Sequence, residues 1–270
     1  MTFARAHDFA CKGRRSIKGW LSRQDAEIML ALMAAQEAVG DGGAVVEIGV
    51  HHGKSFLLMA LANVGGQAYA IDIFDQQALN LDKSGSGNRA VFEANLKRFG
   101  IDPDGIHIDG RSSDKVMPDD ITTAAGPVRM FHIDGGHHRS AVLNDLALAE
   151  ATLADHGIIV VDDVFRPEWP EVSAGLFEYL AGHDRLAVFA IGFNKTFLCR
   201  KEHAEIFRKS LLKNNFLRMY LTRRYKVSRD EILVYQLYPL PEWPMKARRR
   251  FYLTQYHPDL AYWLHRRGWL

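Results

Sequence analysis

The sequence predicts a doubly wound α/β domain built on a mostly parallel sheet of seven strands. Three observations lead to this prediction. Short segments are apolar throughout, as expected for strands that are buried on both faces. Segments of helical periodicity separate them, and a glycine-rich turn follows the first strand. Such alternation is typical of a parallel sheet with helices on both sides.

The elements follow one another from Ser22 onward. Ser22 can cap a helix, and the apolar residues after it recur at spacings of three and four up to Val39. Strands and helices then alternate up to residue 200, where a hairpin closes the sheet. Strands are expected at 44–50, 67–74, 106–109, 128–134 and 157–164, helices at 54–64, around 92–99, at 140–155 and 172–181, and the hairpin at 186–191 and 196–200.

The chain divides into three parts. Residues 1–40 are expected to form a helical lead-in, residues 41–200 the core, and residues 201–270 a helical extension. The extension holds 15 basic and 6 acidic residues, whereas the first 200 residues hold 19 and 26. The basic extension is therefore expected to shape the substrate pocket or to contact a partner, such as a second copy of the chain.

Composition excludes several classes of protein. The net charge of +2 gives no indication of a nucleic-acid partner. Cys11 and Cys199 lie far apart and fit no disulfide scaffold or metal-binding spacing. The N-terminus lacks the apolar core of a secretory signal, and no apolar run approaches the roughly 20 residues that span a bilayer. We therefore expect a cytoplasmic protein without a transmembrane segment.

Candidate ligand-binding residues follow the first two strands. In a doubly wound sheet, ligands bind at the carboxyl ends of the strands. Gly49 and Gly53 follow the first strand, and their spacing matches neither the dinucleotide fingerprint nor the phosphate loop. Asp72 ends the second strand, about 20 residues on, where a carboxylate can hold the hydroxyls of a ribose. The alternative is that the glycines serve packing and that Asp72 caps a loop.

Several motifs in order resemble those of class I S-adenosylmethionine-dependent methyltransferases. More narrowly, the chain is similar to the bacterial group that contains macrocin-type sugar O-methyltransferases, itself similar to catechol O-methyltransferases. The resemblance covers about residues 16–200 and implies the Rossmann-like methyltransferase fold. The motifs are Glu47-x-Gly49-x-x-x-Gly53-x-Ser55, Asp72, Gly110-Arg111-Ser112, His132-Ile133-Asp134-Gly135-Gly136-His137 and Asp162-Asp163.

The resemblance implies a role for each matching position. Glu47 and Gly49 would lie along the methionine and ribose parts of S-adenosylmethionine. Asp72 would bind the ribose hydroxyls, and Ser112 would lie at the adenine edge. Arg111 stands where an acidic residue is frequent in the family. Gly53, Ser55 and Asp134 complete the implied cofactor-binding set.

Three carboxylates are expected to form a metal site. Asp134 ends one strand, and Asp162 and Asp163 end its neighbour; parallel strands lie roughly 4.8 Å apart. Such oxygen donors suit Mg²⁺ or Ca²⁺, and the resemblance implies the same use, with Mg²⁺ the expected ion. The alternative is that these carboxylates only cap and order the loops that follow the strands.

His137 is the expected catalytic base, acting together with Asp134. It follows Asp134 by three residues, the offset at which the catechol-type pattern carries the group that deprotonates the acceptor hydroxyl. Histidine suits this role because its reference pKa is about 6.5. Because His138 is adjacent, the base could instead be His138. The alternative to a catalytic role is a histidine that only bonds to the backbone.

The function expected from these residues is metal-assisted methyl transfer from S-adenosylmethionine to a hydroxyl of a small polyhydroxy acceptor, such as a sugar. A second hypothesis is a metal-independent methyltransferase acting on nitrogen or RNA, which would use the arginine pairs and runs of the extension. A third is a non-catalytic nucleoside-binding module. The arginines concerned are Arg223, Arg224, Arg248, Arg249, Arg250, Arg266 and Arg267.

Overall fold

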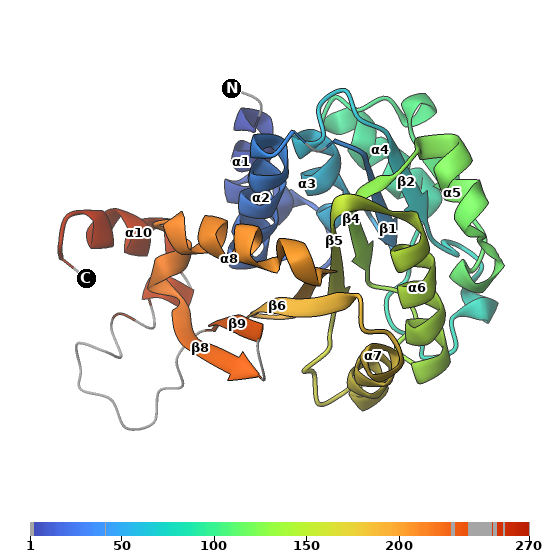
Figure 1. The fold of residues 1–270 in the computed structure, drawn as a ribbon. Coiled ribbons are helices and arrows are strands. Elements are labelled where there is room, and N and C mark those ends of the chain that lie inside the picture. Colours follow the sequence, from blue (N-terminus) through green and yellow to red (C-terminus); the bar gives the residue numbers. More distant parts are fainter. Residues whose placement is uncertain are drawn as a thin grey trace.

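A computed structural model gives the fold of residues 3–40, 42–227, 230–236, 250, 253–255 and 257–269. A sheet of nine strands in the order β3-β2-β1-β4-β5-β7-β6-β9-β8 runs through the molecule (Figure 1). The first five strands of this order are parallel, and β7 is antiparallel to both of its neighbours. The chain thus has the doubly wound, mostly parallel α/β architecture that the sequence predicts.

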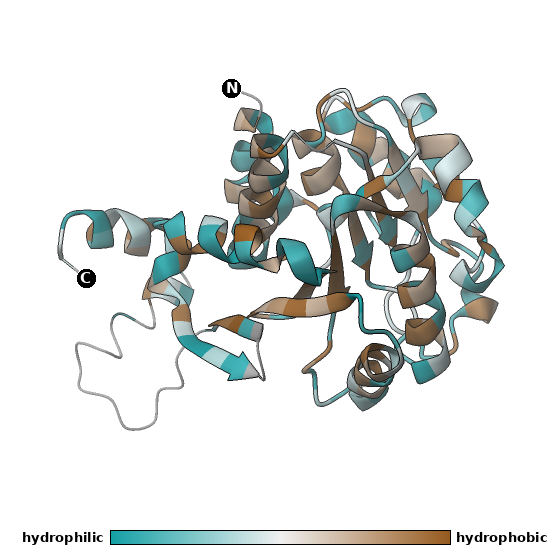
Figure 2. Cartoon of the chain, viewed as in Figure 1, coloured by the Kyte–Doolittle hydropathy of each residue, from teal (hydrophilic) through white to brown (hydrophobic). Residues whose placement is uncertain are grey.

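The strands coincide closely with the apolar runs of the sequence. Every residue of β1, β2 and β4 is buried, because helices cover both faces of the sheet. Figure 2 shows the central strands as predominantly hydrophobic. The core strands are β1 (Ala44–Ile48), β2 (Ala68–Ile71), β3 (His107–Asp109), β4 (Val128–Ile133), β5 (Leu153–Asp162), β6 (Leu186–Gly192) and β7 (Lys195–Arg200).

The helices divide between the two faces of the sheet, each over its own hydrophobic cluster. One cluster receives side chains from α1 (Ala4–Cys11), α2 (Arg23–Ala38), α3 (Lys54–Ala62), α4 (Arg89–Arg98) and α8 (Ala204–Lys213). The other receives side chains from α5 (Pro118–Ala125), α6 (Arg139–Thr152) and α7 (Pro170–Gly182). A further helix, α10 (Pro258–Arg266), lies near the C-terminus. Within the described residues, no helix is both long and apolar enough to cross a membrane.

The C-terminal extension differs from the helical one that the sequence predicts, and it raises the strand number from seven to nine. It adds β9 (Asp230–Tyr235), which pairs in parallel with β6, and β8 (Leu221–Val227), which pairs antiparallel with β9. The arginines of β8 were interpreted as part of a helical face; instead they lie on an edge strand, which Figure 2 shows as mostly hydrophilic. Charged side chains on an edge strand oppose pairing with other chains. Arg248 and Arg249 lie outside the described residues.

The extension also packs into the core rather than forming a separate unit. Phe207 and Leu211 of α8 are fully buried, and so is Leu233 of β9. They belong to the same hydrophobic cluster as α2 and α3. The boundary at residue 200 therefore separates stretches of different charge, but the packing continues across it.

We predict that Phe207→Ala destabilises the whole protein. The ring is fully buried and lies 5.5 Å from the ring of Phe189 on β6. Removing a buried phenylalanine ring costs about 3–5 kcal/mol. Urea unfolding should show one transition at a lower midpoint. Phe177→Ala is the control, because that ring is 50% exposed and its loss should cost about 0.5 kcal/mol or less. Equal urea midpoints for Phe207→Ala and Phe177→Ala would show that the extension contributes nothing to the hydrophobic core.

Candidate active site at the carboxyl edge of the sheet

The glycine turn after β1 packs tightly against the loop after β4. Gly49 has φ +84°, and a Cβ placed there would lie 1.8 Å from the carbonyl oxygen of Asp134. Gly53 has φ +87° at the start of α3, and its Cβ would lie 2.8 Å from the Phe92 ring. Only glycine fits either position without backbone movement. Both residues bring the backbone close to the sheet edge, and a side chain at Gly49 would disturb the loop that carries Asp134.

Glu47, on β1, is fully buried, and only one of its two carboxylate oxygens has hydrogen-bond partners among the described residues. Its Oε1 accepts hydrogen bonds from the Ser55 hydroxyl and from Nδ1 of His132, 2.6 Å away. Its Oε2 is buried and has no hydrogen-bond partner among the described residues. A buried polar atom without a partner is costly, so this oxygen is suited to accept a hydrogen bond from a ligand.

Asp72 and Ser112 follow neighbouring strands, β2 and β3. The Asp72 carboxylate accepts hydrogen bonds from the backbone N–H groups of His51, at 2.7 Å, and Phe74, at 2.5 Å. Burial raises the pKa of Asp72 above its ordinary value. Ser112 precedes a short 3-10 helix, and its neighbour Arg111 forms ion pairs with Asp109 and Asp120. Asp72 therefore connects the glycine turn to the end of β2, as a ribose-binding carboxylate would.

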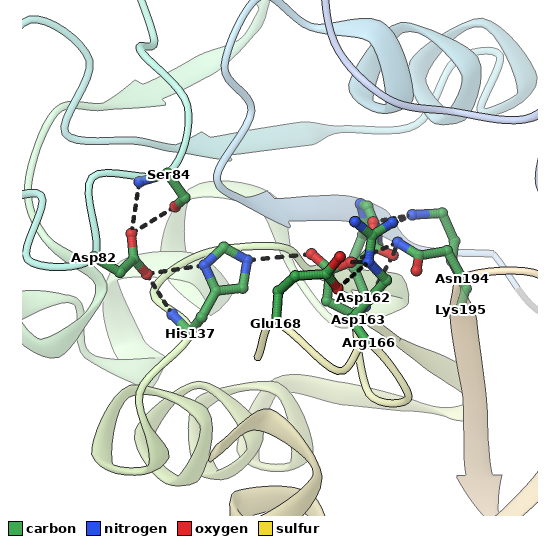
Figure 3. Close-up of polar contacts among 10 residues, drawn as sticks. Asp82, Ser84, His137, Asp162, Asp163, Arg166, Glu168, Asn194 and Lys195 are labelled. Carbon is green, nitrogen blue, oxygen red and sulfur yellow. Dashed lines mark hydrogen bonds and ion pairs between the residues drawn. The ribbon is translucent and has the colours of Figure 1, made fainter. Parts of the chain in front are cut away.

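A buried lysine, which the sequence analysis did not single out, links β4, β5 and β7. Nζ of Lys195 lies 2.9 Å from Nε2 of His132 and 2.5 Å from Oδ2 of Asp162 (Figure 3). Because an ammonium can only donate, Nε2 of His132 accepts, and Nδ1–H donates to Glu47. The result is a continuous hydrogen-bonded chain from Glu47 to Asp162.

The charges of this chain stabilise one another. Burial alone would raise the pKa of Asp162, but the Lys195 ammonium holds it well below its ordinary value. Conversely, burial alone would lower the pKa of Lys195, but Asp162 and Asp134 raise it. The pair is therefore ionised at neutral pH. A paired buried charge is tolerated, whereas an unpaired one would be strongly destabilising.

Asp134, His137 and Asp163 converge at the same edge. One ligand atom from each lies within 4.8 Å of the others. Burial raises the pKa of Asp134 well above its ordinary value, and the charges of Asp162 and Asp163 add to this effect. Asp163 has φ +60°, a left-handed conformation that is rare outside glycine and is often found at functional sites. A cation would relieve the repulsion among these carboxylates.

Asp82 fixes the orientation of His137. Its Oδ2 accepts hydrogen bonds from the backbone N–H and from Nδ1 of His137, both at 2.8 Å (Figure 3). Nε2 of His137 lies 3.2 Å from Oδ2 of Asp163, and the ring stacks on Trp169 at 4.2 Å. Burial opposes protonation, but the contacts with Asp163 and Asp82 raise the pKa of His137. Asp82 lies in a Gly/Ser-rich loop, and no spacing in the sequence relates it to His137.

The structure brings together most of the predicted site residues. Asp134 links two groups of close ligand atoms: one with Glu47 and His132, the other with His137 and Asp163. Asp162 is placed differently from its two predicted partners. Its Oδ2 contacts Lys195, and its Oδ1 accepts from Asn194 Nδ2, at 2.7 Å. It belongs to none of the groups of close ligand atoms found among the described residues.

A cavity of about 630 Å³ opens beside the first turn of α2. That turn reaches the same edge of the sheet, because Asp25 interacts with the backbone of Asn194. Asn194 in turn donates hydrogen bonds to both Asp162 and Asp163. The cavity itself is lined by the residues that precede Asp25 on this turn, by two arginines near the N-terminus and by residues near the C-terminus. Its lining residues are Arg14, Arg15, Ser22, Arg23, Gln24, Gln255, His257, Pro258, Asp259 and Leu260.

We predict that Lys195→Met destabilises the protein by about 3–5 kcal/mol at pH 7, because it leaves the Asp162 carboxylate buried without its cation. The pKa of Asp162 is lowered in the folded wild type, so this stability is lost as pH falls below the unfolded value of about 3.9. The difference in the free energy of unfolding between Lys195→Met and the wild type should therefore become smaller in acid. Urea unfolding at several pH values measures it. Lys209→Met is the control, since Lys209 is exposed; equal effects would contradict the prediction.

Comparison with known proteins agrees with this geometry. Residues 46–164 match a family described as a methyltransferase domain. No curated protein matches the sequence of the chain. The O-methyltransferase NovP is similar in structure, with a TM-score of 0.57 and 16% identity over 66% of this chain and 80% of that chain.

Two further solved structures have the same fold. Cofactor-bound Rv0187 from MTB has a TM-score of 0.51 and 21% identity, over 73% of this chain and 86% of that chain. An O-methyltransferase from Bacillus cereus in complex with SAH has a TM-score of 0.51 and 15% identity, over 72% of this chain and 89% of that chain. The matched family domain spans the glycine turn, Asp72, Ser112 and all three edge carboxylates. Residues 46–164 are thus a methyltransferase domain, and the chain has the fold of the solved O-methyltransferases.

Proposed function

We propose that the protein transfers a methyl group from S-adenosylmethionine to a hydroxyl of a small polyhydroxy acceptor, with the help of a divalent cation. The observation that carries this proposal is the convergence of Asp134, His137 and Asp163 at the carboxyl edge of the sheet. This edge also bears the glycine turn, so a cofactor bound there lies beside the carboxylates. NovP and the Bacillus cereus protein, which have this fold, are both described as O-methyltransferases.

The residues around the glycine turn fit S-adenosylmethionine. The unpartnered Oε2 of Glu47 can accept a hydrogen bond from the ammonium of its methionine part. Asp72 can accept from the ribose hydroxyls, because each carboxylate oxygen retains a free lone pair beside its backbone hydrogen bond. Ser112, after the neighbouring strand, would lie at the adenine edge. Bound S-adenosylmethionine supplies a methyl group already activated by the sulfonium.

The edge carboxylates fit a hard divalent cation such as Mg²⁺. Asp134 and Asp163 would supply oxygen ligands, and water or acceptor oxygens would complete the shell. Asp162 would join them as a third ligand only if Lys195 moved away. We therefore assign Asp162, with Asn194, to holding Asp163 in position.

His137 would remove the proton from the acceptor hydroxyl at Nε2. Asp82 holds the proton on Nδ1 and fixes the ring, so Nε2 faces the carboxylate edge. A base oriented by a carboxylate is the arrangement that general-base catalysis requires. Trp169 covers one face of the ring and limits its rotation. Asp134 would bind the acceptor or the cation at the same place.

The cavity beside α2 would admit the acceptor. Ser22, Arg23 and Gln24, which line it, directly precede Asp25, and Asp25 contacts the backbone of Asn194. Two arginines of the extension, by contrast, are engaged within the chain: Arg224 pairs with Glu231, and the Arg267 guanidinium covers the Trp263 ring. These contacts favour a small-molecule acceptor over RNA.

We predict that Asp72→Ala weakens binding of S-adenosylhomocysteine about ten- to a hundredfold. A hydrogen bond to a charged group is worth about 1.5–3 kcal/mol. Titration calorimetry measures the affinity, and thermal unfolding confirms that the variant is folded. The control is Asp104→Ala, which removes an exposed carboxylate within the short 3-10 helix that precedes β3. A folded Asp72→Ala protein with wild-type affinity would refute the cofactor assignment.

We predict that Asp163→Asn weakens Mg²⁺ binding at least about tenfold while leaving S-adenosylhomocysteine affinity nearly unchanged. Calorimetric titration of Mg²⁺ into the protein with S-adenosylhomocysteine bound measures this. Asp104→Asn again serves as control. Once an acceptor is identified from a panel of sugars and catechols, chelation should abolish turnover. Full turnover after exhaustive chelation would exclude the metal and favour a metal-independent methyltransferase.

A further inference from the structure

A group of close ligand atoms apart from those at the carboxyl edge lies at the other end of β5. It consists of Asp155, His156 and His203, with one ligand atom of each within 4.8 Å of the others. Asp155 and His156 are near the start of β5, and His203 ends the short 3-10 helix that follows β7. Asp162 follows His156 by six positions, which corresponds to roughly 20 Å along a strand. The cluster is therefore separate from the candidate active site.

A bulge in β5 explains how two consecutive residues share one site. Side chains of consecutive strand residues normally point to opposite faces. Val128 of β4 pairs with Leu153 of β5, and the next pair is Met130 with Ile158. Over this stretch, however, β4 advances by two residues while β5 advances by five. The extra residues of β5 leave the regular pairing, and such bulges redirect side chains. Gly157 makes this path possible, since a Cβ there would lie 2.5 Å from the Leu153 side chain.

The two distances from Asp155 to the histidines lie at or slightly above the edge length of a coordination tetrahedron. Oδ2 of Asp155 lies 3.3 Å from Nε2 of His203 and 3.6 Å from Nδ1 of His156. Ligands about 2.0–2.1 Å from a tetrahedral zinc ion stand about 3.3–3.4 Å apart. Nε2 of His203 is buried and has no hydrogen-bond partner among the described residues, so its approach to Asp155 is not a hydrogen bond. The centroids of the two imidazole rings lie 3.9 Å apart, and the ring planes are tilted by 31°.

The support behind the cluster is rigid. Nε2 of Gln36, a fully buried residue of α2, donates hydrogen bonds to the carbonyl oxygens of His156, at 2.7 Å, and Arg129, at 2.6 Å. Arg129 donates back to Oε1 of Gln36. The bulge is thus fixed to α2 and β4. Asp155 is 70% exposed, which leaves room for water on the solvent side.

We propose that Asp155, His156 and His203 form a binding site for a transition-metal ion of the Zn²⁺ type. Two imidazoles and one carboxylate are a ligand set that zinc accepts, with water in the fourth position. Mg²⁺ prefers oxygen ligands alone and is not expected here. The ion would join the bulge of β5 to the segment that leads from β7 into α8, so it would stabilise the junction between core and extension. This proposal does not depend on the proposed function.

The experiment is titration of Zn²⁺ into the metal-free protein with saturating Mg²⁺ present, so that the oxygen-rich edge is occupied. We expect one Zn²⁺ per chain and a rise in the unfolding temperature with Zn²⁺ concentration. His203→Ala and His156→Ala should each weaken binding at least about tenfold and remove the rise. Substitution of Co²⁺ gives a second readout, because its visible absorption reports tetrahedral coordination.

Two controls separate this site from other metal binding. His183→Ala removes a histidine outside the cluster, and Asp163→Asn removes a ligand of the candidate active site; both should retain Zn²⁺ binding. Unfolding curves without metal show whether each variant is folded. The proposal is overturned if the wild type binds no Zn²⁺, or if folded His203→Ala and His156→Ala proteins bind it as tightly as the wild type. Loss of binding in Asp163→Asn alone would also overturn it.

Discussion

The buried ammonium of Lys195 is the group on which the arrangement of the sheet edge depends. Three aspartates end two adjacent strands, and their charges would repel without compensation. Lys195 compensates one of them from β7, which is antiparallel and therefore begins where β5 ends. The same ammonium donates to His132 and so fixes the proton that His132 donates to Glu47. One cation thus orders both the cofactor side and the carboxylate side of the edge.

The antiparallel strand is also the reason why the C-terminal extension matters. Because β7 reverses direction, β6 lies outside it and would be the edge of a seven-stranded sheet. Residues 221–235 cover that edge with β9 and β8. The charged side chains of β8 then form the new edge, which discourages further pairing. Burial of Phe207, Leu217 and Tyr235 anchors these elements, so the basic extension and the catalytic core fold as one packed body.

Local patterns in the sequence predicted the parallel strands, the helices and the turn after β1, because each is encoded within a few residues. They also predicted Asp134, Asp162 and Asp163 as neighbours, since ends of parallel strands meet. The structure groups Asp134 and Asp163 with His137, which only the family resemblance implied, and places Asp162 against Lys195. Lys195 and Asp82 could not be found in this way. Lys195 resembles any charged residue at a hairpin, and only the pairing of β5 with β7 shows that it is buried. Asp82 reaches His137 across 55 residues of chain. The alternating pattern of 221–227 could have revealed β8, but its arginines favoured a solvated helix.

The two ends of β5 differ in the chemistry they offer to a cation. At the carboxyl end, parallel strands deliver carboxylates, and the nearest histidine is held by Asp82 with one nitrogen occupied. At the other end, the bulge and the 3-10 helix after β7 deliver two imidazoles around one carboxylate. Hard cations select the first set and borderline transition metals the second. The two proposals together therefore assign two different ions to one chain, separated by the type of ligand at each end of β5.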